Sequence, residues 1–570
     1  MTDRMNHAQF LEEELAAETE SFKDKMHTAA QYLLQNGEMY IGKYLNFDGS
    51  GNMVLKISPN RSLPRKREYL YCFMVPKELR NHNNWGSMTY SDLLKVRGIS
   101  TQAVCVWQQK NKDGFFHVGF RSVDEDFHKA VTDSADFILL LGPDVPPFQY
   151  IVNLQDIVKN NFSAEAQSVL DQNFKLPVQT PILLDHVKNI PNFILSQIGQ
   201  CDALILQGPP GTGKTFQIAQ MCIDLCREGK RILVTALTNR ALMELAEKVY
   251  DKTKELKIYK TNLTADESKE LPELLYAKDP YLSECNNLML STFYMASNVM
   301  GISKPIFDFV IMDEASQAFL AMFAAAKILG KKNIWVGDIK QLSPIVQINA
   351  DNVIKRNYSP YINGLETVSS FPDIPTYQMT ETYRLVPRSA EYTGLFYRNT
   401  LEPKTMMSSD STMLCNDGIS RFFNKQGGPA LIKMHLEPGN KKPDNAICLT
   451  AQLVDWLLRN AGNMEIAVLS YFVETTKALQ KEIYATPQSP KNLLVETVSR
   501  VQGLTTDVVI FVVPNTRYSY SLNPKLFNVA TSRARRYTLI VADDQICGQS
   551  NSPEVNQYLS KLNNEFSFEV

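Results

Sequence analysis

A glycine-rich loop lies directly between a short apolar strand, ALILQ, and a helix-forming run, FQIAQMCIDLCREG. The loop consists of Gly208, Pro209, Pro210, Gly211, Thr212, Gly213, Lys214 and Thr215. Glycines let backbone N–H groups curl around phosphates, and the helix N-terminus adds the positive end of its dipole. The Lys214 ammonium can reach the β- and γ-phosphates, and the Thr215 hydroxyl can hold magnesium. The loop therefore predicts a domain that binds a nucleoside triphosphate together with Mg2+.

Two further apolar strands end in polar residues that suit the same chemistry. FDFVIM is followed by Asp313 and Glu314, and NIWVGD leads to Gln341. A carboxylate at the tip of a neighbouring strand can bind magnesium through water, and the next one can orient or deprotonate the attacking water. We therefore assign Asp313 to the metal, Glu314 to the catalytic base and Gln341 to sensing of the γ-phosphate. Trp335 lies inside its strand, so we interpret it as a core residue rather than a base-stacking one.

Apolar strands alternate with helices from about residue 200 onward, and this alternation predicts the fold class. The strands are continuous apolar runs, as parallel sheets covered on both faces require. A second set of such strands follows after about residue 371, from EIAVLSYF to YTLIVAD. We predict an α/β protein with two doubly wound, RecA-like parallel-sheet domains, the first over 151–370 and the second over 371–570.

The first 150 residues have a different pattern. Apolar residues recur at three- and four-residue steps over 7–36 and Gly37 follows, which predicts one long helix. Short β-type segments separated by Gly, Asn, Asp and Pro turns come next, and the Pro-rich 143–148 ends the region. We therefore expect residues 1–150 to form a helical stalk and a small β-barrel-like domain.

Composition and charge limit the class of protein only loosely. The formal net charge is −2, which neither supports nor excludes binding to nucleic acid, because such binding needs only a basic strip along one channel of the surface. Nine dispersed cysteines suit a reducing cytoplasm, and we interpret Cys222 and Cys226 as buried thiols rather than zinc ligands. The acidic N-terminus has no signal-peptide core and no apolar run is long enough to span a membrane. We expect a cytoplasmic protein without a membrane partner.

The motifs, taken in order, resemble those of superfamily 1 helicases, specifically the branch that contains the nonsense-mediated RNA decay helicase. The resemblance spans residues 200 to 545. Beyond the loop and the strand ends it includes LVTALTNRAL, LSTF, ETYRLVPRS, VSRVQGLTTD and NVATSRARR. The N-terminal helix and the β-rich block also resemble this branch. The resemblance implies an ATP hydrolase with ATP and Mg2+ in its site.

The resemblance also implies roles for residues around the nucleotide. Arg384 and Arg533 resemble the two arginine fingers, whose permanently charged planar forks stabilise transition-state charge. Tyr383 is placed to stack on the adenine, and Gln179 resembles, more loosely, the glutamine that reads it. The coupling motif contains Gln502 and Gly503, but Thr505 replaces the usual Glu, as in the recombination-nuclease and relaxase helicases. This departure leaves a ribose or phosphate contact and the exact branch open.

Contacts to a nucleic-acid strand are expected in two places. At strand ends of the first motor domain the resemblance implies sequence-blind contacts to the strand's backbone from Thr238, Asn239, Ser291 and Thr292. In the N-terminal region the densest basic cluster contains Arg61, Arg65, Lys66 and Arg67. Phosphate contact and a solvated turn are both open interpretations of this cluster.

These features predict an ATP-dependent helicase or translocase that moves along single strands. The resemblance implies 5′→3′ movement, and we favour DNA slightly over RNA, although no motif encodes contact to the 2′-hydroxyl. The expected partner is single-stranded or partly duplex nucleic acid, and the sequence names no protein partner. Two alternatives remain: a motor that displaces bound proteins without processive unwinding, and a nucleotide-controlled nucleic-acid-binding switch.

Overall fold

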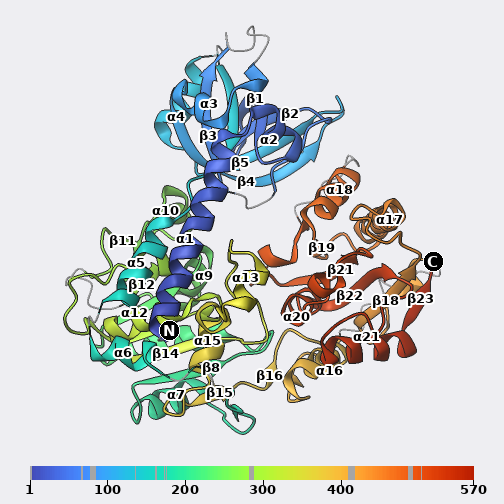
Figure 1. Ribbon diagram of the computed structural model, residues 1–570. Coiled ribbons are helices and arrows are strands. Elements are labelled where there is room, and N and C mark those ends of the chain that lie inside the picture. The colour runs from blue at the N-terminus through green and yellow to red at the C-terminus, as the bar shows by residue number, and fades with distance from the viewer. Residues whose placement is uncertain are drawn as a thin grey trace. The chain divides into compact units, whose positions relative to one another are not determined.

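The computed structural model describes residues 3–65, 69–77, 85–134, 137–160, 163–172, 174, 176–281, 288–407, 418–484, 492–501 and 503–570 (Figure 1). The chain forms two compact units, each built from three separate stretches of sequence. The first unit contains Met1–Thr19, Pro147–Met407 and Pro524–Ser532. The second contains Glu20–Pro146, Ser408–Asn523 and Arg533–Val570.

The first unit is organised around a nine-stranded parallel sheet in the order β11-β10-β12-β9-β13-β14-β8-β15-β7. In chain order its strands are β7 Ile182–Leu183, β8 Ala203–Gln207, β9 Ile232–Ala236, β10 Ile258–Thr261, β11 Leu275–Ala277, β12 Leu288–Thr292, β13 Phe307–Met312, β14 Gly330–Gly337 and β15 Thr376–Gln378. Parallel strands have their carboxyl ends at one edge of a sheet. The residues that follow β8, β13, β14, β9, β12 and β10 therefore gather along one edge.

Both faces of this sheet are buried, which explains why its strands are apolar throughout. Along β8, Ile205 packs into one core while Leu204 and Leu206 pack into the other, as the two-residue repeat of a strand requires. One face is covered by α5 Phe148–Lys159, α6 Ala164–Leu170, α12 Leu320–Leu329, α14 Ser359–Ile362 and α15 Gly364–Val368. The other face is covered by α7 Ile190–Ile198, α8 Lys214–Arg227 and α9 Asn239–Tyr250. Trp335 is fully buried against Phe323, so its interpretation as a core residue is confirmed.

The second unit contains a six-stranded parallel sheet in the order β20-β19-β21-β22-β18-β23. Its strands are β18 Gly428–Met434, β19 Ile466–Ser470, β20 Leu493–Thr497, β21 Thr506–Val513, β22 Ala534–Asp543 and β23 Ser567–Glu569. The helices of this part are α17 Asp444–Asn460, α18 Val473–Ile483, α19 Tyr518–Ser521 and α21 Pro553–Glu565.

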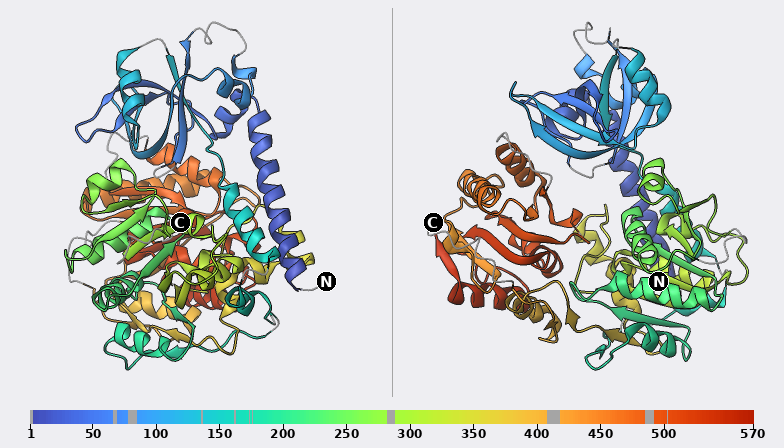
Figure 2. Two further views of the ribbon diagram at one scale, coloured as in Figure 1. Left: turned by 90° about the vertical axis from the view of Figure 1, so that its left-hand side faces the viewer. Right: turned by 180° about the vertical axis from the view of Figure 1, so that it is seen from behind.

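The second unit also contains a closed antiparallel barrel in the order β1-β2-β5-β4-β3-β6, drawn in blue in Figure 2. Its strands are β1 Tyr40–Phe47, β2 Met53–Ile57, β3 Tyr69–Pro76, β4 Ser100–Lys110, β5 Phe116–Arg121 and β6 Phe137–Gly142, with α3 Tyr90–Lys95 and α4 Glu125–Asp133 between them. The register of β4 against β5 shifts between Cys105 and Trp107, an irregularity typical of strands that bend to close a barrel.

The N-terminal stretch forms two helices, and the prediction of one helix over 7–36 is wrong in this respect. α1 Asp3–His27 ends before Thr28, and α2 Ala30–Asn36 ends at Gly37, which has the positive φ of a C-terminal cap. The helix is interrupted between them because the backbone of residues 28–30 is hydrogen-bonded to the backbone of Met88 and Tyr90, and Ala29 forms an isolated β-bridge with Thr89. The apolar period continues through the break, so local sequence carries no sign of it.

The predicted fold class is confirmed: two doubly wound parallel sheets accompany a helical N-terminus and a barrel. The sequence placed the boundary between the motor domains at residue 370, whereas the first unit extends to Met407. β15 pairs with β8, and β17 Glu402–Pro403 pairs with β16 Glu381–Thr382, so this stretch stays with the first unit. The interpretation of Cys222 and Cys226 as buried thiols is confirmed, and burial raises the pKa of Cys226 to about 12. Within the described ranges, none of the helices combines the length and the apolar character that a bilayer span requires.

Candidate functional site

The phosphate loop runs from the end of β8 to the start of α8. The Gly208 N–H donates to the Gly337 carbonyl at 2.9 Å, which joins the loop to the end of β14. The Thr212 hydroxyl donates to the Pro209 carbonyl at 2.9 Å and so closes the turn from inside. The Lys214 ammonium donates to the Gly208 carbonyl at 2.5 Å, so its charge lies over the concave side of the loop.

Two glycines of the loop occupy positions where a side chain does not fit. A Cβ at Gly208 would lie 2.3 Å from Lys214 Cγ, and one at Gly211 would lie 2.4 Å from Arg384 Cβ. Gly211 also has a φ of 77°, a left-handed conformation that favours glycine. Both positions therefore require glycine, because the loop packs tightly against Lys214 and against the segment that carries Arg384.

The two carboxylates after β13 differ in their surroundings. Asp313 is buried, its N–H donates to the Thr235 carbonyl of β9 at 2.9 Å, and its Oδ1 accepts from the Glu314 N–H at 2.8 Å. Burial raises the pKa of the Asp313 carboxyl to about 6, although the Glu314 N–H and the Lys214 charge act against this rise. Glu314 has a φ of 51°, which is strained for a residue with a side chain, and Gln317 Nε2 donates to its Oε2 at 3.0 Å. The backbone thus presents two neighbouring carboxylates in different directions.

The residues present fit a nucleotide with its magnesium ion. The loop leads from a strand into the N-terminus of α8, a setting that binds phosphates, and the Lys214 ammonium can pair with them. Hard oxygen donors suit Mg2+, and the Thr215 hydroxyl and the Asp313 carboxylate are of this kind. Burial raises the pKa of the Asp313 carboxyl, and a nearby cation would stabilise the charged form of this carboxyl.

The segment that carries Tyr383 and Arg384 lies against the phosphate loop, within the first unit. The Tyr383 N–H donates to the Gly211 carbonyl at 2.9 Å, and the Thr382 hydroxyl donates to the Pro210 carbonyl at 2.9 Å. Tyr383 is 59% exposed and its hydroxyl donates to Glu381 at 2.7 Å, so the side chain lies at the surface beside the loop. The sequence had placed this segment in the second motor domain.

Gln341 belongs to a buried hydrogen-bond chain, named here the relay, which consists of Gln341, Asp338, Tyr397 and Asn528. Gln341 Nε2 and the Tyr397 hydroxyl donate to the same Asp338 oxygen, at 2.9 and 2.6 Å. Asn528 Nδ2 in α20 Pro524–Thr531 donates to the Tyr397 hydroxyl at 2.8 Å. All four residues are buried, so the relay joins the end of β14 to α20 without intervening solvent.

The relay continues through Ser532 to the candidate arginine finger Arg384. The Ser532 hydroxyl donates to the Asn528 carbonyl at 2.6 Å, and the Ser532 carbonyl accepts from the Arg384 guanidinium at 3.3 Å. Arg533, the next residue, is 2% exposed and its guanidinium donates to the Leu504 carbonyl at 3.4 Å within the second unit. The structure thus brings Gln341, Arg384 and Ser532 into one hydrogen-bonded neighbourhood.

Three other predicted residues are Gln179, Gly503 and Gln502. Gln179 donates through its side chain to the Phe371 carbonyl, and its N–H donates to the Ser369 carbonyl at 3.2 Å. Gly503 has a φ of 79° and lies in the short loop before β21. Gln502 lies outside the described residues.

The four residues expected at strand ends differ in exposure. Thr238 is exposed and caps α9, and Asn239 is half-buried. Ser291 and Thr292 are buried, and the Ser291 hydroxyl is hydrogen-bonded to the Thr261 hydroxyl at 3.0 Å. Of the four, Thr238 and Asn239 therefore have side chains that a strand can reach in this arrangement.

Two arginines of the basic cluster in the N-terminal region are described: Arg61 is exposed, and Arg65 is paired inside the protein. Arg65 lies 3.6 Å from the buried Glu496 carboxylate of β20, and only 13% of its side chain is exposed. Lys66 and Arg67 lie outside the described residues. The pairing favours a structural role for Arg65 within the second unit.

Sequence reasoning missed Asp338, Tyr397 and Asn528 of the relay and the buried Lys260 described below. Asp338 and Asn528 both lie within motifs that the sequence analysis describes, but no role was assigned to either. A polar residue without a role in such a motif is the signal that could have indicated them. Tyr397 and Lys260 carry no local signal, because their partners lie far away in the sequence or on other strands.

Two family models match the chain, both described as AAA domains, over residues 194–347 and 365–545. Among solved structures, that of the Arterivirus nonstructural protein 10 (helicase) is 12% identical with a TM-score of 0.39, and the alignment covers 92% of this chain and 82% of that chain.

Two curated relatives are similar over the motor region. The chain is 31% identical over 188 residues to the DNA replication ATP-dependent helicase/nuclease DNA2 of Saccharomyces cerevisiae, covering 31% of this chain and 12% of the relative. It is 24% identical over 435 residues to the ATP-dependent helicase upf1 of Schizosaccharomyces pombe, covering 63% of this chain and 45% of the relative. The alignments thus span less than half the length of either relative.

Proposed function

Because the chain belongs to the superfamily 1 helicases, we propose that it hydrolyses ATP in order to move along a single strand of nucleic acid. The observation that carries this proposal is the order of strands in the sheet of the first unit. β14 and β13 neighbour one another between β8, which leads into the phosphate loop, and β9, which leads to Thr238 and Asn239. One rigid sheet edge thus holds the hydrolytic groups and the candidate strand contacts side by side.

Each side chain has a role in the proposed reaction. The loop N–H groups and Lys214 bind the phosphates, Thr215 and Asp313 hold the metal, and Glu314 takes a proton from the attacking water. Magnesium, when bound, offsets negative charge on the phosphate oxygens. Gln341, Arg384 and Arg533 sense and stabilise the γ-phosphate, and Tyr383 stacks on the adenine. The contact of Gln341 with Asp338 supports its role, because the relay links Gln341 through hydrogen bonds to α20.

We propose single-stranded or partly duplex nucleic acid as the substrate, with 5′→3′ movement and DNA preferred slightly over RNA. The similarity to a relative named for DNA replication supports DNA. Hydroxyl and amide contacts at Thr238 and Asn239 favour recognition of the strand's backbone rather than its bases.

The test is the ATPase rate of the purified protein, alone and with single-stranded DNA or RNA, beside the Glu314→Gln variant. We expect a stimulation of about tenfold or more that disappears in Glu314→Gln, because the amide cannot take up a proton. The polymer that stimulates better identifies the substrate. A rate that neither polymer changes would contradict the motor and leave a nucleotide-controlled switch.

A further inference from the structure

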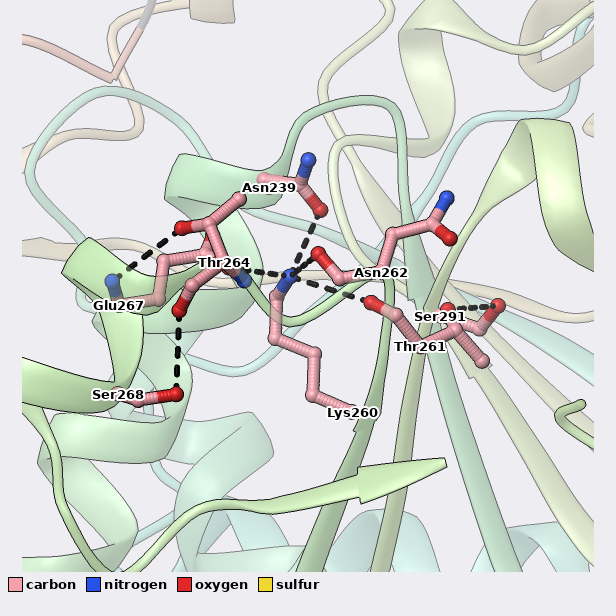
Figure 3. Close-up of polar contacts among 8 residues, drawn as sticks. All are labelled: Asn239, Lys260, Thr261, Asn262, Thr264, Glu267, Ser268 and Ser291. Carbon is pink, nitrogen blue, oxygen red and sulfur yellow. Dashed lines mark hydrogen bonds and ion pairs between the residues drawn. The ribbon is translucent and has the colours of Figure 1, made fainter. Parts of the chain in front are cut away.

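Lys260 in β10 is a lysine with no exposed side-chain surface, a rare situation for a residue that normally keeps its ammonium in water. Figure 3 shows its ammonium surrounded by acceptors. It donates to Asn239 Oδ1 at 2.9 Å, to Glu267 Oε2 at 3.0 Å, and to the carbonyls of Thr261 and Asn262 at 3.3 and 3.4 Å. A buried cation with this many partners is held in one place.

The acceptors are themselves held by the turn after β10. Glu267 Oε2 also accepts from the Thr264 N–H at 3.0 Å, and the Glu267 N–H donates to the Thr264 hydroxyl at 3.2 Å. This reciprocal pair caps α10 Ala265–Glu270. Asn262 has a φ of 50°, so the chain turns sharply to bring its carbonyl to the ammonium. Burial lowers the pKa of Lys260, and the Glu267 charge acts against that decrease.

The order of strands explains why this lysine reaches Asn239. β10, β12 and β9 are neighbours, and Asn239 is the first residue of the helix after β9. The Thr261 hydroxyl meets the Ser291 hydroxyl of β12 at 3.0 Å, so the carboxyl ends of the strands are tied together. Lys260 therefore spans from β10 to the loop after β9, where strand contacts are proposed.

The contact with Lys260 determines how the Asn239 amide is oriented. An ammonium group only donates, so the oxygen of the amide must face it. The two N–H donors of the amide then point away from Lys260, and within the described part of the chain no acceptor is recorded for them. Phosphate oxygens are acceptors of the matching kind.

We propose that Lys260 is a positioning residue for nucleic acid: without touching the strand, it fixes the Asn239 amide so that its N–H donors meet a backbone phosphate. This inference rests on the proposed function, because it requires a strand at this edge of the sheet. It distinguishes Lys260 from a basic residue that pairs with phosphate directly.

The two roles predict different dependence on salt. We expect Lys260→Met to weaken the Kd for a fluorescently labelled oligo(dT) or oligo(U) by about tenfold, which corresponds to about 1.4 kcal/mol. The slope of log Kd against log salt should stay at the wild-type value, whereas loss of a direct phosphate contact changes it by about 0.7 for a single strand. Lys257→Met is the matched control: it removes an exposed lysine directly before the start of the same strand and should leave both values unchanged.

A double-mutant cycle tests whether Lys260 acts through Asn239. Lys260→Met should add no further loss in an Asn239→Ala background, since the group that it positions is already absent. Asn239→Asp keeps the contact with Lys260, and therefore the fold, but presents an oxygen to phosphate and should weaken binding more than Asn239→Ala. This variant keeps the test valid even if Lys260→Met folds poorly.

Three outcomes would overturn the inference. If Lys260→Met binds with the wild-type Kd but has a lowered melting temperature, the role of Lys260 is purely structural. If the losses in the double-mutant cycle are additive, Lys260 does not act through Asn239. A slope changed by about 0.7 would make it a direct contact. If the wild-type protein binds neither polymer, the proposed function fails, and this inference fails with it.

Discussion

Replacing Tyr397 with Phe removes one oxygen atom from the middle of the relay. That hydroxyl donates to the Asp338 carboxylate at 2.6 Å and accepts from Asn528 Nδ2 at 2.8 Å. A hydrogen bond to a charged group contributes about 1.5–3 kcal/mol and a neutral one about 0.5–1.5 kcal/mol. Asp338 keeps Gln341, and Asn528 keeps the Lys340 carbonyl at 2.9 Å, so we expect a loss near the lower end, about 2 kcal/mol.

If docking of α20 is required for hydrolysis, this loss lowers strand-stimulated kcat by about 30-fold, because about 1.4 kcal/mol corresponds to a factor of ten. The KM for ATP should change little, since the Tyr397 hydroxyl is bonded to Asp338 and Asn528, which follow β14 and lie in α20 rather than in the phosphate loop. Steady-state kinetics at saturating oligonucleotide measures both values. Tyr377→Phe is the control, because its hydroxyl donates to Gln197 at 3.0 Å in the same unit but outside the relay. Wild-type kcat in Tyr397→Phe, or an equal loss in both variants, would refute the coupling.

Three further predictions follow from the geometry. Gly211→Ala places a methyl group 2.4 Å from Arg384 Cβ at a positive φ, so ATP binding measured by calorimetry should fall at least about 100-fold, or about 2.7 kcal/mol. His7 is stacked on Tyr361, and burial lowers the pKa of its imidazole to about 3. In the unfolded chain the imidazole keeps its ordinary pKa of about 6.5 and binds a proton more readily, so the free energy of unfolding decreases as the pH falls from about 6.5 to about 3. His7→Phe should therefore show a smaller drop in melting temperature between pH 7.5 and pH 5 than the wild type. Thr89→Ala removes the cap of α3 and should lower the free energy of unfolding by about 1 kcal/mol in denaturant titration.

The parts of the site that sequence predicts well are those that a single local segment defines. The phosphate loop from Gly208 to Thr215 and the pair Asp313 and Glu314 lie between a strand and a helix, so the strand–loop–helix pattern determines both their conformation and their position. The two parallel sheets can be predicted equally well, because continuous apolar strands must be covered on both faces of a sheet.

The remainder depends on contacts between segments that are distant in the sequence. Tyr397 and Asn528 are 131 residues apart, and no local pattern indicates that they meet. Ser291 looks suited to contact a strand, but its hydroxyl is buried against Thr261, since a small polar residue near a strand end can face either way. Arg65 looks like part of a solvated basic cluster, yet inside the second unit it is paired with the buried Glu496 carboxylate.

In the proposed function, ATP hydrolysis drives movement along a strand. The most direct measurement is displacement of streptavidin from oligonucleotides biotinylated at either the 3′ or the 5′ end, with the wild type and Glu314→Gln. We predict ATP-dependent displacement from the 3′ end by the wild type only, which is the outcome of 5′→3′ movement. Hydrolysis that strands stimulate but that displaces streptavidin from neither end would contradict the claim and identify a nucleotide-controlled binding switch.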